Sequence, residues 1–288
     1  MPARIPYHHP FDKNYSLDYA NPNKGNVSER MKRYGSGTKT RIEQCHIDET
    51  VHLLYSESNV EESAEDIDYE ATQILKETSR ANSVIATRIL GLFESILETN
   101  QEEEDEKVQA YKVLDPEKLP KALDQTDWNG TAAEVAGRLA SNLVLKHALP
   151  NANHRTSIAT IQFYLRRIEQ SFEMPRTSTA TYDWMTWVDE YIVESKCLST
   201  VRRKIHLFKH LQQFGADVIE RKDGIDIRLD NYELDLPYSD SQKIYAIRHE
   251  QLWIDFVQTA LMRADAARLI THPALSKHRF ADEIRQLA

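Results

Sequence analysis

The chain has 288 residues, of which 41% are hydrophobic, enough to build one large core or two smaller ones. Its net charge of −9 argues against a protein whose main binding partner is nucleic acid. No apolar run approaches the roughly 18 residues of a membrane span, and the first residues contain no apolar block of signal-peptide length. We therefore expect no membrane partner and a cytoplasmic location.

Residues 1–61 are expected to form a polar N-terminal arm without a packed fold. Residues 1–41 carry eight Lys or Arg against three Asp or Glu, whereas residues 42–70 carry ten carboxylates and no Lys or Arg. This reversal of charge indicates that the two parts lie against each other, or that the basic part meets an acidic partner.

Residues 62–178 are expected to form a helical core. Apolar residues recur at helical spacing from 62 to 99. Thr131 and Glu134 fit the S/T-x-x-E pattern of a capping box, which predicts that a second helix begins there. Pro150 is expected to end that helix, and a further apolar helix follows at once.

Residues 179–288 are expected to form a helical C-terminal region with one β-hairpin. Alternating residues flank the turn at Asp223-Gly224, which predicts a hairpin over 218–229. Cys45 and Cys197 are the two cysteines, and their wide separation fits neither a disulfide framework nor a zinc site. The whole chain is therefore expected to be mainly α-helical.

The stretch LVLKHALPNANHRTS, residues 143–157, gathers polar groups between two apolar helices. A helix start presents unpaired N–H groups and the positive end of its dipole, which suit a phosphate. Arg155 adds a guanidinium that can bind two phosphate oxygens at once. Asn153 can cap the helix or donate to an oxyanion. A neutral His147 could take a proton from an attacking hydroxyl. The stretch therefore predicts a site of phosphoryl or nucleotidyl transfer.

HALPNANHR resembles the motif of the Fic/Doc (Fido) family, H-P-F-x-D/E-G/A-N-G/K-R, which lies on a helix–loop–helix inside an all-helical domain. The resemblance implies that His147 is the base that activates a target hydroxyl. It also implies that Asn153 and Arg155 hold nucleotide phosphates and that Ala152 lets the backbone turn. Leu149 stands where the family has a buried aromatic residue.

The resemblance implies an enzyme that moves AMP or phosphate from ATP or another nucleotide to a hydroxyl of a protein substrate, in the manner of a toxin. Asn151 replaces the acidic residue that binds magnesium in the family, so Mg²⁺ is expected to be held weakly. His154 replaces a Gly or Lys and would line the phosphate site. Ile158 stands where Fic enzymes carry a second arginine, so the chain looks more like the Doc branch. No intact inhibitory helix motif is visible, so any restraint on the activity would come from a separate antitoxin-like protein or from the weak metal site itself.

A second hypothesis belongs to a different class: a catalytically impaired Fic-fold module that regulates a partner. In its DNA-binding version, residues 199–229 act as a basic recognition helix and a wing. The acidic surroundings favour instead a solvated helix packed on its neighbours. The site residues also have structural alternatives: His147 as a helix cap, Arg155 in a surface ion pair, and Asn151 and Asn153 as turn residues.

Overall fold

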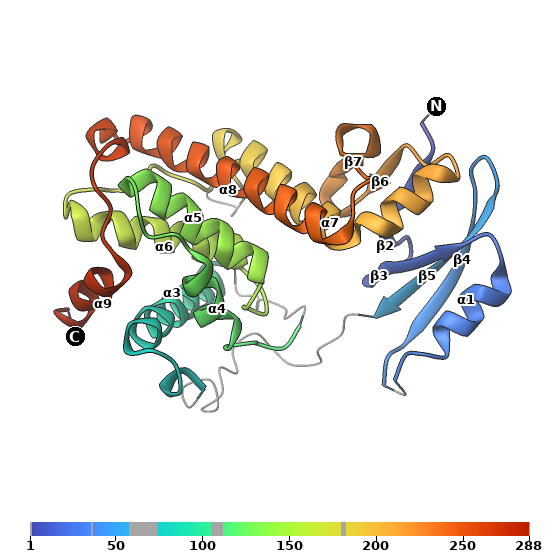
Figure 1. Cartoon of the computed structure of the whole chain (residues 1–288), viewed down its shortest axis with the longest axis horizontal. Helices are drawn as coiled ribbons and strands as arrows, with labels where there is room; N and C mark the ends of the chain where they lie inside the picture. The colour runs from blue at the N-terminus through green and yellow to red at the C-terminus, as the bar shows by residue number, and fades with distance from the viewer. Residues whose placement is uncertain (1, 36, 58–73, 105–111, 180–182, 288) are drawn as a thin grey trace. The chain divides into compact units, whose positions relative to one another are not determined.

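The computed structural model describes residues 2–35, 37–57, 74–104, 112–179 and 183–287 (Figure 1). The N-terminal elements are β1 (Arg4–Pro6), β2 (His8–His9), β3 (Asp12–Asn21), α1 (Lys24–Met31), β4 (Thr40–His46) and β5 (Thr50–Glu57). The elements that follow are α3 (Arg80–Glu104), α4 (Lys118–Gln125), α5 (Ala132–Lys146), α6 (Asn153–Ile168), α7 (Thr186–Gln213), β6 (Val218–Glu220), β7 (Asp226–Arg228), α8 (Tyr238–Arg263) and α9 (Lys277–Arg285).

The chain divides into two compact units, and each is discontinuous in sequence. Unit 1 comprises residues 1–59 and 193–245, and unit 2 comprises residues 60–192 and 246–288. Helices α7 and α8 each contribute residues to both units. The boundaries of these units therefore differ from those of the three consecutive segments named above, residues 1–61, 62–178 and 179–288.

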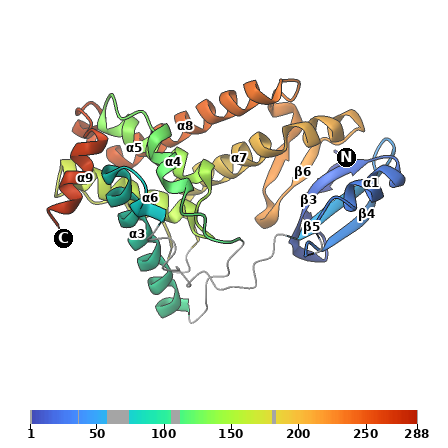
Figure 2. The ribbon, with the colours of Figure 1, turned by 60° about the horizontal axis from the view of Figure 1, so that its bottom comes forward.

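Unit 1 contains a four-stranded antiparallel sheet, curled like half a barrel, with the strand order β2-β3-β5-β4. Helix α1 packs against β3 and β5 (Figures 1 and 2) and buries Val27. Asn23 caps this helix, because its side chain accepts a hydrogen bond from the Gly25 N–H at 2.8 Å. The inward side chains of β3 and β5, such as Leu17 and Leu53, form the core of the sheet.

A second sheet in unit 1 joins the N-terminus to the predicted hairpin. Strands β6 and β7 pair antiparallel around Asp223 and Gly224, both at positive φ, which confirms the hairpin. Strand β1 pairs with β6 in parallel, with Ile5 opposite Ile219. The sheet order is therefore β1-β6-β7, and one edge of the hairpin is covered by the chain's own N-terminal strand.

The expectation of a mainly α-helical chain with a polar arm is wrong. The structure is 56% helical and 16% strand, and residues 1–57 supply five of the strands within the described ranges. A β-bulge in β3 moves the buried positions from Tyr15 and Leu17 to Ala20, which breaks the period-2 pattern by which a strand is recognised. The polar outward residues of the sheet also gave the segment the composition of an arm.

Unit 2 is helical in its described residues, and α5 lies buried at its centre. The Thr131–Glu134 capping box is confirmed: the Glu134 N–H donates to Thr131 Oγ1 at 3.3 Å, and the Thr131 N–H donates to Glu134 Oε2 at 2.7 Å. Helix α5 packs on α4 and α6. It also passes so close to α8 that a Cβ atom on Gly137 would lie 2.6 Å from Ile254 Cα. Helix α3 begins at Arg80, and residues 62–73 of the expected helix lie outside the described residues.

Candidate functional site

The candidate site is the six-residue connection between α5 and α6, residues 147–152. Helix α5 ends at Lys146, so His147 caps the helix and is not part of its last turn. His147 and Ala152 both have a φ of 51°, in the left-handed region. Few residues other than glycine adopt this conformation, and a small side chain at Ala152 lowers the steric cost. The expected turn at Ala152 is therefore confirmed.

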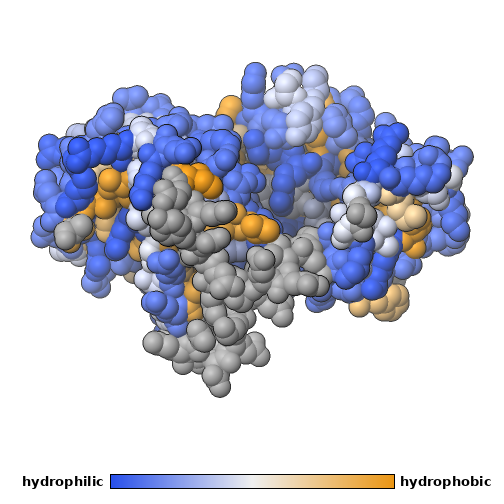
Figure 3. Space-filling view, turned by 90° about the horizontal axis from the view of Figure 1, so that it is seen from below, coloured by the Kyte–Doolittle hydropathy of each residue, from blue (hydrophilic) through white to orange (hydrophobic). Residues whose placement is uncertain are grey.

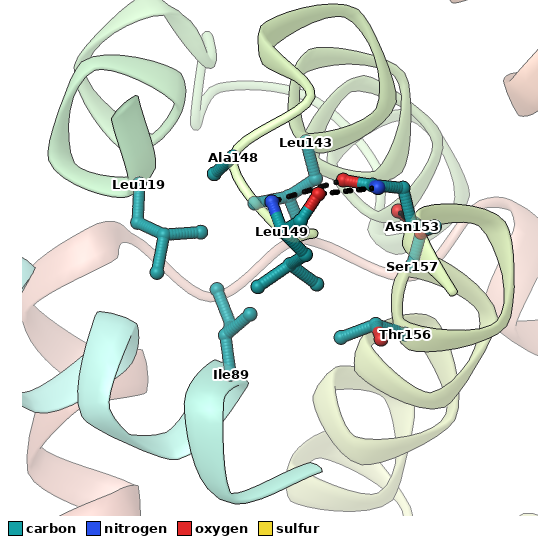
Figure 4. A pocket seen from close by; sticks show the side chains of 8 residues that line it. All are labelled: Ile89, Leu119, Leu143, Ala148, Leu149, Asn153, Thr156 and Ser157. Carbon is teal, nitrogen blue, oxygen red and sulfur yellow. Dashed lines mark hydrogen bonds between the residues drawn. The ribbon is translucent and has the colours of Figure 1, made fainter. Parts of the chain in front are cut away.

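Asn153, the first residue of α6, uses its side-chain amide to hold the connection together (Figure 4). Its Oδ1 atom accepts from the Leu149 N–H at 3.2 Å, and its Nδ2 atom donates to the Leu149 carbonyl at 2.9 Å. Nδ2 also lies 3.3 Å from the Asn151 carbonyl. The side chain is only 7% exposed. Both ends of the amide are therefore committed to the backbone of the loop.

Leu149 anchors the loop in the core of unit 2. Its side chain is buried beside Ile89 and Leu119 (Figure 4), which confirms the buried position expected from the motif. The cavity next to it measures only about 10 Å³. That volume is about the minimum for one water molecule and far too small for a phosphate. A phosphate would therefore have to bind on the outer side of the loop.

Thr156 lines the same small cavity one turn into α6. Its Oγ1 atom is buried and has no hydrogen-bond partner among the described residues. The neighbouring Ser157 hydroxyl donates to the Asn153 carbonyl at 2.8 Å. Thr156 is thus a buried polar group whose hydroxyl destabilises the fold unless a water molecule binds to it.

The side chains of His154 and Arg155 lie against aromatic rings from other parts of unit 2. The His154 ring is stacked near Trp253 of α8, with 6.1 Å between centroids and 27° between planes. The Arg155 guanidinium carbon lies 5.7 Å from the centre of the Trp184 ring, a cation–π contact. Both histidine and arginine are partly exposed. The two tryptophans could not be assigned to this site from sequence, because they are distant along the chain and fit core helices.

His147 and Asn151 are also partly exposed and take part in the structure of the loop. The Lys112 ammonium donates to the His147 carbonyl. Asn151 Oδ1 accepts from the Ala152 N–H at 2.6 Å, as in an Asx turn. Lys112 is a basic residue near the loop that the motif did not reveal.

Magnesium does not fit the residues of this loop. Asn151 supplies one neutral oxygen, and that oxygen already accepts a hydrogen bond. Across the described ranges, no three His, Cys, Asp or Glu side chains gather as a metal-ion site. Mg²⁺ prefers several oxygen ligands, commonly including carboxylates. The residues of this loop therefore do not form a magnesium site by themselves.

The basic helix of the alternative DNA-binding hypothesis has its charges engaged within unit 1. Lys204 Nζ lies 2.6 Å from Asp18 Oδ1, and Lys209 pairs with Asp235. Arg202 Nε donates to the Gln242 carbonyl at 3.1 Å, and burial lowers the pKa of this guanidinium. These contacts leave fewer cations for phosphates than the sequence suggests.

The face of the molecule drawn in Figure 3 is predominantly polar. Hydrophilic residues dominate it, and hydrophobic residues form small separate patches. No helix in the described part of the chain has both the length and the apolar character that crossing a bilayer requires.

Comparison with known proteins places the chain in a family but gives no function. No curated protein and no solved structure is significantly similar to this chain. The model of a family of unknown function (DUF8172) matches residues 1–288, the full length. The chain belongs to this family of unknown function.

Proposed function

We propose that the α5–α6 connection binds the phosphates of a nucleotide and transfers AMP or phosphate to a hydroxyl group of a protein. The observation that carries the proposal is the arrangement of the loop. His147 follows the last residue of α5, a left-handed Ala152 precedes α6, and Arg155 lies in the first turn of α6. This arrangement agrees with the helix–loop–helix that the sequence motif implies.

In this proposal the first turn of α6 and Arg155 neutralise the phosphate charge. His147 accepts the proton of the target hydroxyl as its oxygen attacks phosphorus. Attack at the α-phosphorus forms an AMP ester and releases pyrophosphate, whereas attack at the γ-phosphorus forms a phosphate ester and releases the nucleoside diphosphate. His154 lines the site, and its stacking near Trp253 fixes the ring on that side.

Asn153 has a different role in this proposal from that of a phosphate ligand. Its amide hydrogen bonds are made to Leu149 and Asn151, so it acts as a positioning residue that sets the shape of the loop. The nucleotide carries its own Mg²⁺ in this scheme, because the loop offers no carboxylate. The compartment we propose is the cytoplasm, and an antitoxin-like protein would control the reaction.

The test is to incubate the purified chain with MgATP, labelled at the α- or the γ-position, and cell lysate. We expect label to enter a protein band and the labelled position to identify the group transferred. His147→Ala should abolish labelling, and Arg155→Gln should reduce it strongly. The matched control is His278→Ala, which removes an exposed histidine of α9 and should leave labelling unchanged.

Asn151→Asp separates the enzyme from the catalytically impaired binding module. If the parent chain labels nothing and Asn151→Asp gains labelling, the chain is an impaired module of the same fold. If neither protein labels any target, the transferase proposal is wrong. DNA retention that is lost in Arg203→Gln would support the DNA-binding version of the alternative.

A further inference from the structure

Unit 1 contains a cavity of about 490 Å³ that the proposed transfer reaction does not use. Its walls come from β3, α1 and the second half of α7, together with Tyr238 at the start of α8. Every residue of this lining belongs to unit 1. The volume lies within the range of roughly 300–1,000 Å³ that is usual for small-molecule sites.

The cavity is positively charged although the chain as a whole is acidic. Arg30, Arg203 and Lys204 line it, and Asp18 is the carboxylate in the lining, so two positive charges are left over. Two histidines also line it, His206 and His210, and burial lowers the pKa of His210. A local excess of cations selects an anionic ligand.

Asp18 orders two of these cations. Its carboxylate lies 2.6 Å from Lys204 Nζ and 3.8 Å from Arg30 Nη2, and it accepts a hydrogen bond from the Tyr34 hydroxyl. Burial opposes ionisation of Asp18, but the bonds from Lys204 and Tyr34 prevail and lower its pKa. The carboxylate therefore stays charged and fixes Lys204 and Arg30 in place.

Arg30 lines the cavity and lies near two tyrosine rings. Its guanidinium carbon lies 5.8 Å from the centre of the Tyr19 ring and 6.0 Å from that of Tyr34. The side chain as a whole is 43% exposed, so Arg30 is open to an anion that enters the cavity.

Helix α7 is broken where it forms the cavity wall. Lys204 has φ −120° and ψ 20°, outside the helical region. The side-chain amide of Gln242 donates to the Arg202 carbonyl just before the break. The break lies between Arg203 and His206, so side chains on both sides of it face a single cavity.

An aromatic surface completes the lining. The His206 ring stacks on Tyr238, with 5.6 Å between centroids and 24° between planes. Tyr238 is 54% exposed, so a ligand in the cavity can reach its ring. Tyr19 also lines the cavity, from β3. Flat rings of this kind suit stacking with a nucleobase.

We propose that this cavity binds a nucleoside monophosphate. A phosphate monoester carries about −1.5 to −2 charges at neutral pH, which matches the two unbalanced positive charges of the lining. Arg203 and Arg30 bind the phosphate, and the base stacks at Tyr238. The proposal does not rest on the transferase reaction, because the cavity and the α5–α6 loop belong to different units.

The test measures binding of AMP, GMP, CMP and UMP to the full chain by calorimetry and maps it by hydrogen–deuterium exchange. At least one of the four should slow exchange in residues 18–21 and 203–210. Its nucleoside alone and inorganic phosphate alone should bind at least about tenfold more weakly, because each lacks one half of the contacts. Arg203→Gln and Tyr238→Ala should each weaken binding about tenfold or more.

Two control variants test whether the nucleotide binds in this cavity. Arg279→Gln removes an arginine of α9 that is likewise exposed and should change nothing. Arg155→Gln affects the α5–α6 loop and should leave protection of 18–21 and 203–210 intact. If no monophosphate protects these segments at millimolar concentration, or if the nucleoside alone binds as well, the inference is wrong. Binding abolished by Arg155→Gln but not by Arg203→Gln would also overturn it, since the nucleotide would then occupy the loop of unit 2.

Discussion

Replacing Asn153 tests whether its amide determines the shape of the α5–α6 loop. Asn153→Ala leaves the N–H and the carbonyl of Leu149 without their side-chain partner in a buried setting. Each unsatisfied buried group costs about 1–3 kcal/mol, so the loss of both partners should lower the free energy of unfolding by roughly 2–6 kcal/mol. Asn153→Asp should be at least as destabilising, because a carboxylate oxygen would then face the Leu149 carbonyl, which now lies 2.9 Å from Nδ2.

Equilibrium unfolding in guanidinium chloride, followed by tryptophan fluorescence, measures this effect in the relevant unit. All four tryptophans of the chain lie in unit 2. The matched control is Asn142→Ala, which removes a half-buried amide with one hydrogen bond to Thr126 Oγ1 and should cost about 1 kcal/mol. If Asn153→Ala costs no more than Asn142→Ala, the amide does not hold the loop, and the reasoning about its role fails.

Three further predictions concern packing and protonation. Gly137→Ala should destabilise unit 2 by about 1–3 kcal/mol, because the new Cβ would lie 2.6 Å from Ile254 Cα. Gly91→Ala in α3 is the control, because a Cβ there would have no atom within 4 Å. It should stabilise unit 2 by about 0.5–1 kcal/mol in the same unfolding assay. Thr156→Val should raise the midpoint of unfolding, because it removes a buried hydroxyl without a described partner; a lower midpoint would mean that the hydroxyl binds a water molecule in the small cavity. Burial, aided by Lys222 and Arg221, lowers the pKa of His8 from 6.5 to about 3. Between these values the unfolded chain binds the proton and the folded chain does not, so stability should fall as the pH drops below 6.5. Hydrogen exchange of the β3 amides should show this loss in the wild type and a smaller one in His8→Gln; equal losses in both would exclude His8 as the cause.

The sequence determined several local features, one of them in unit 1 and the others in unit 2. The capping box at Thr131 and the hairpin at Asp223-Gly224 are present because their hydrogen bonds and backbone angles involve neighbours in sequence. The buried Leu149 and the left-handed Ala152 follow from the motif in the same way. These features could be predicted because residues within a few positions of one another decide them.

The tertiary structure decided the rest, since contacts between distant segments have no periodic signal in the sequence. Strand β1 pairs with β6 across more than 200 residues, and the bulge in β3 hides the alternation that would have revealed its sheet. Asp18 neutralises a lysine of α7 that the sequence offered as a DNA contact. Sequence named the residues of the loop, but only the fold showed that the Asn153 amide is already bonded, because its partners depend on how the loop closes.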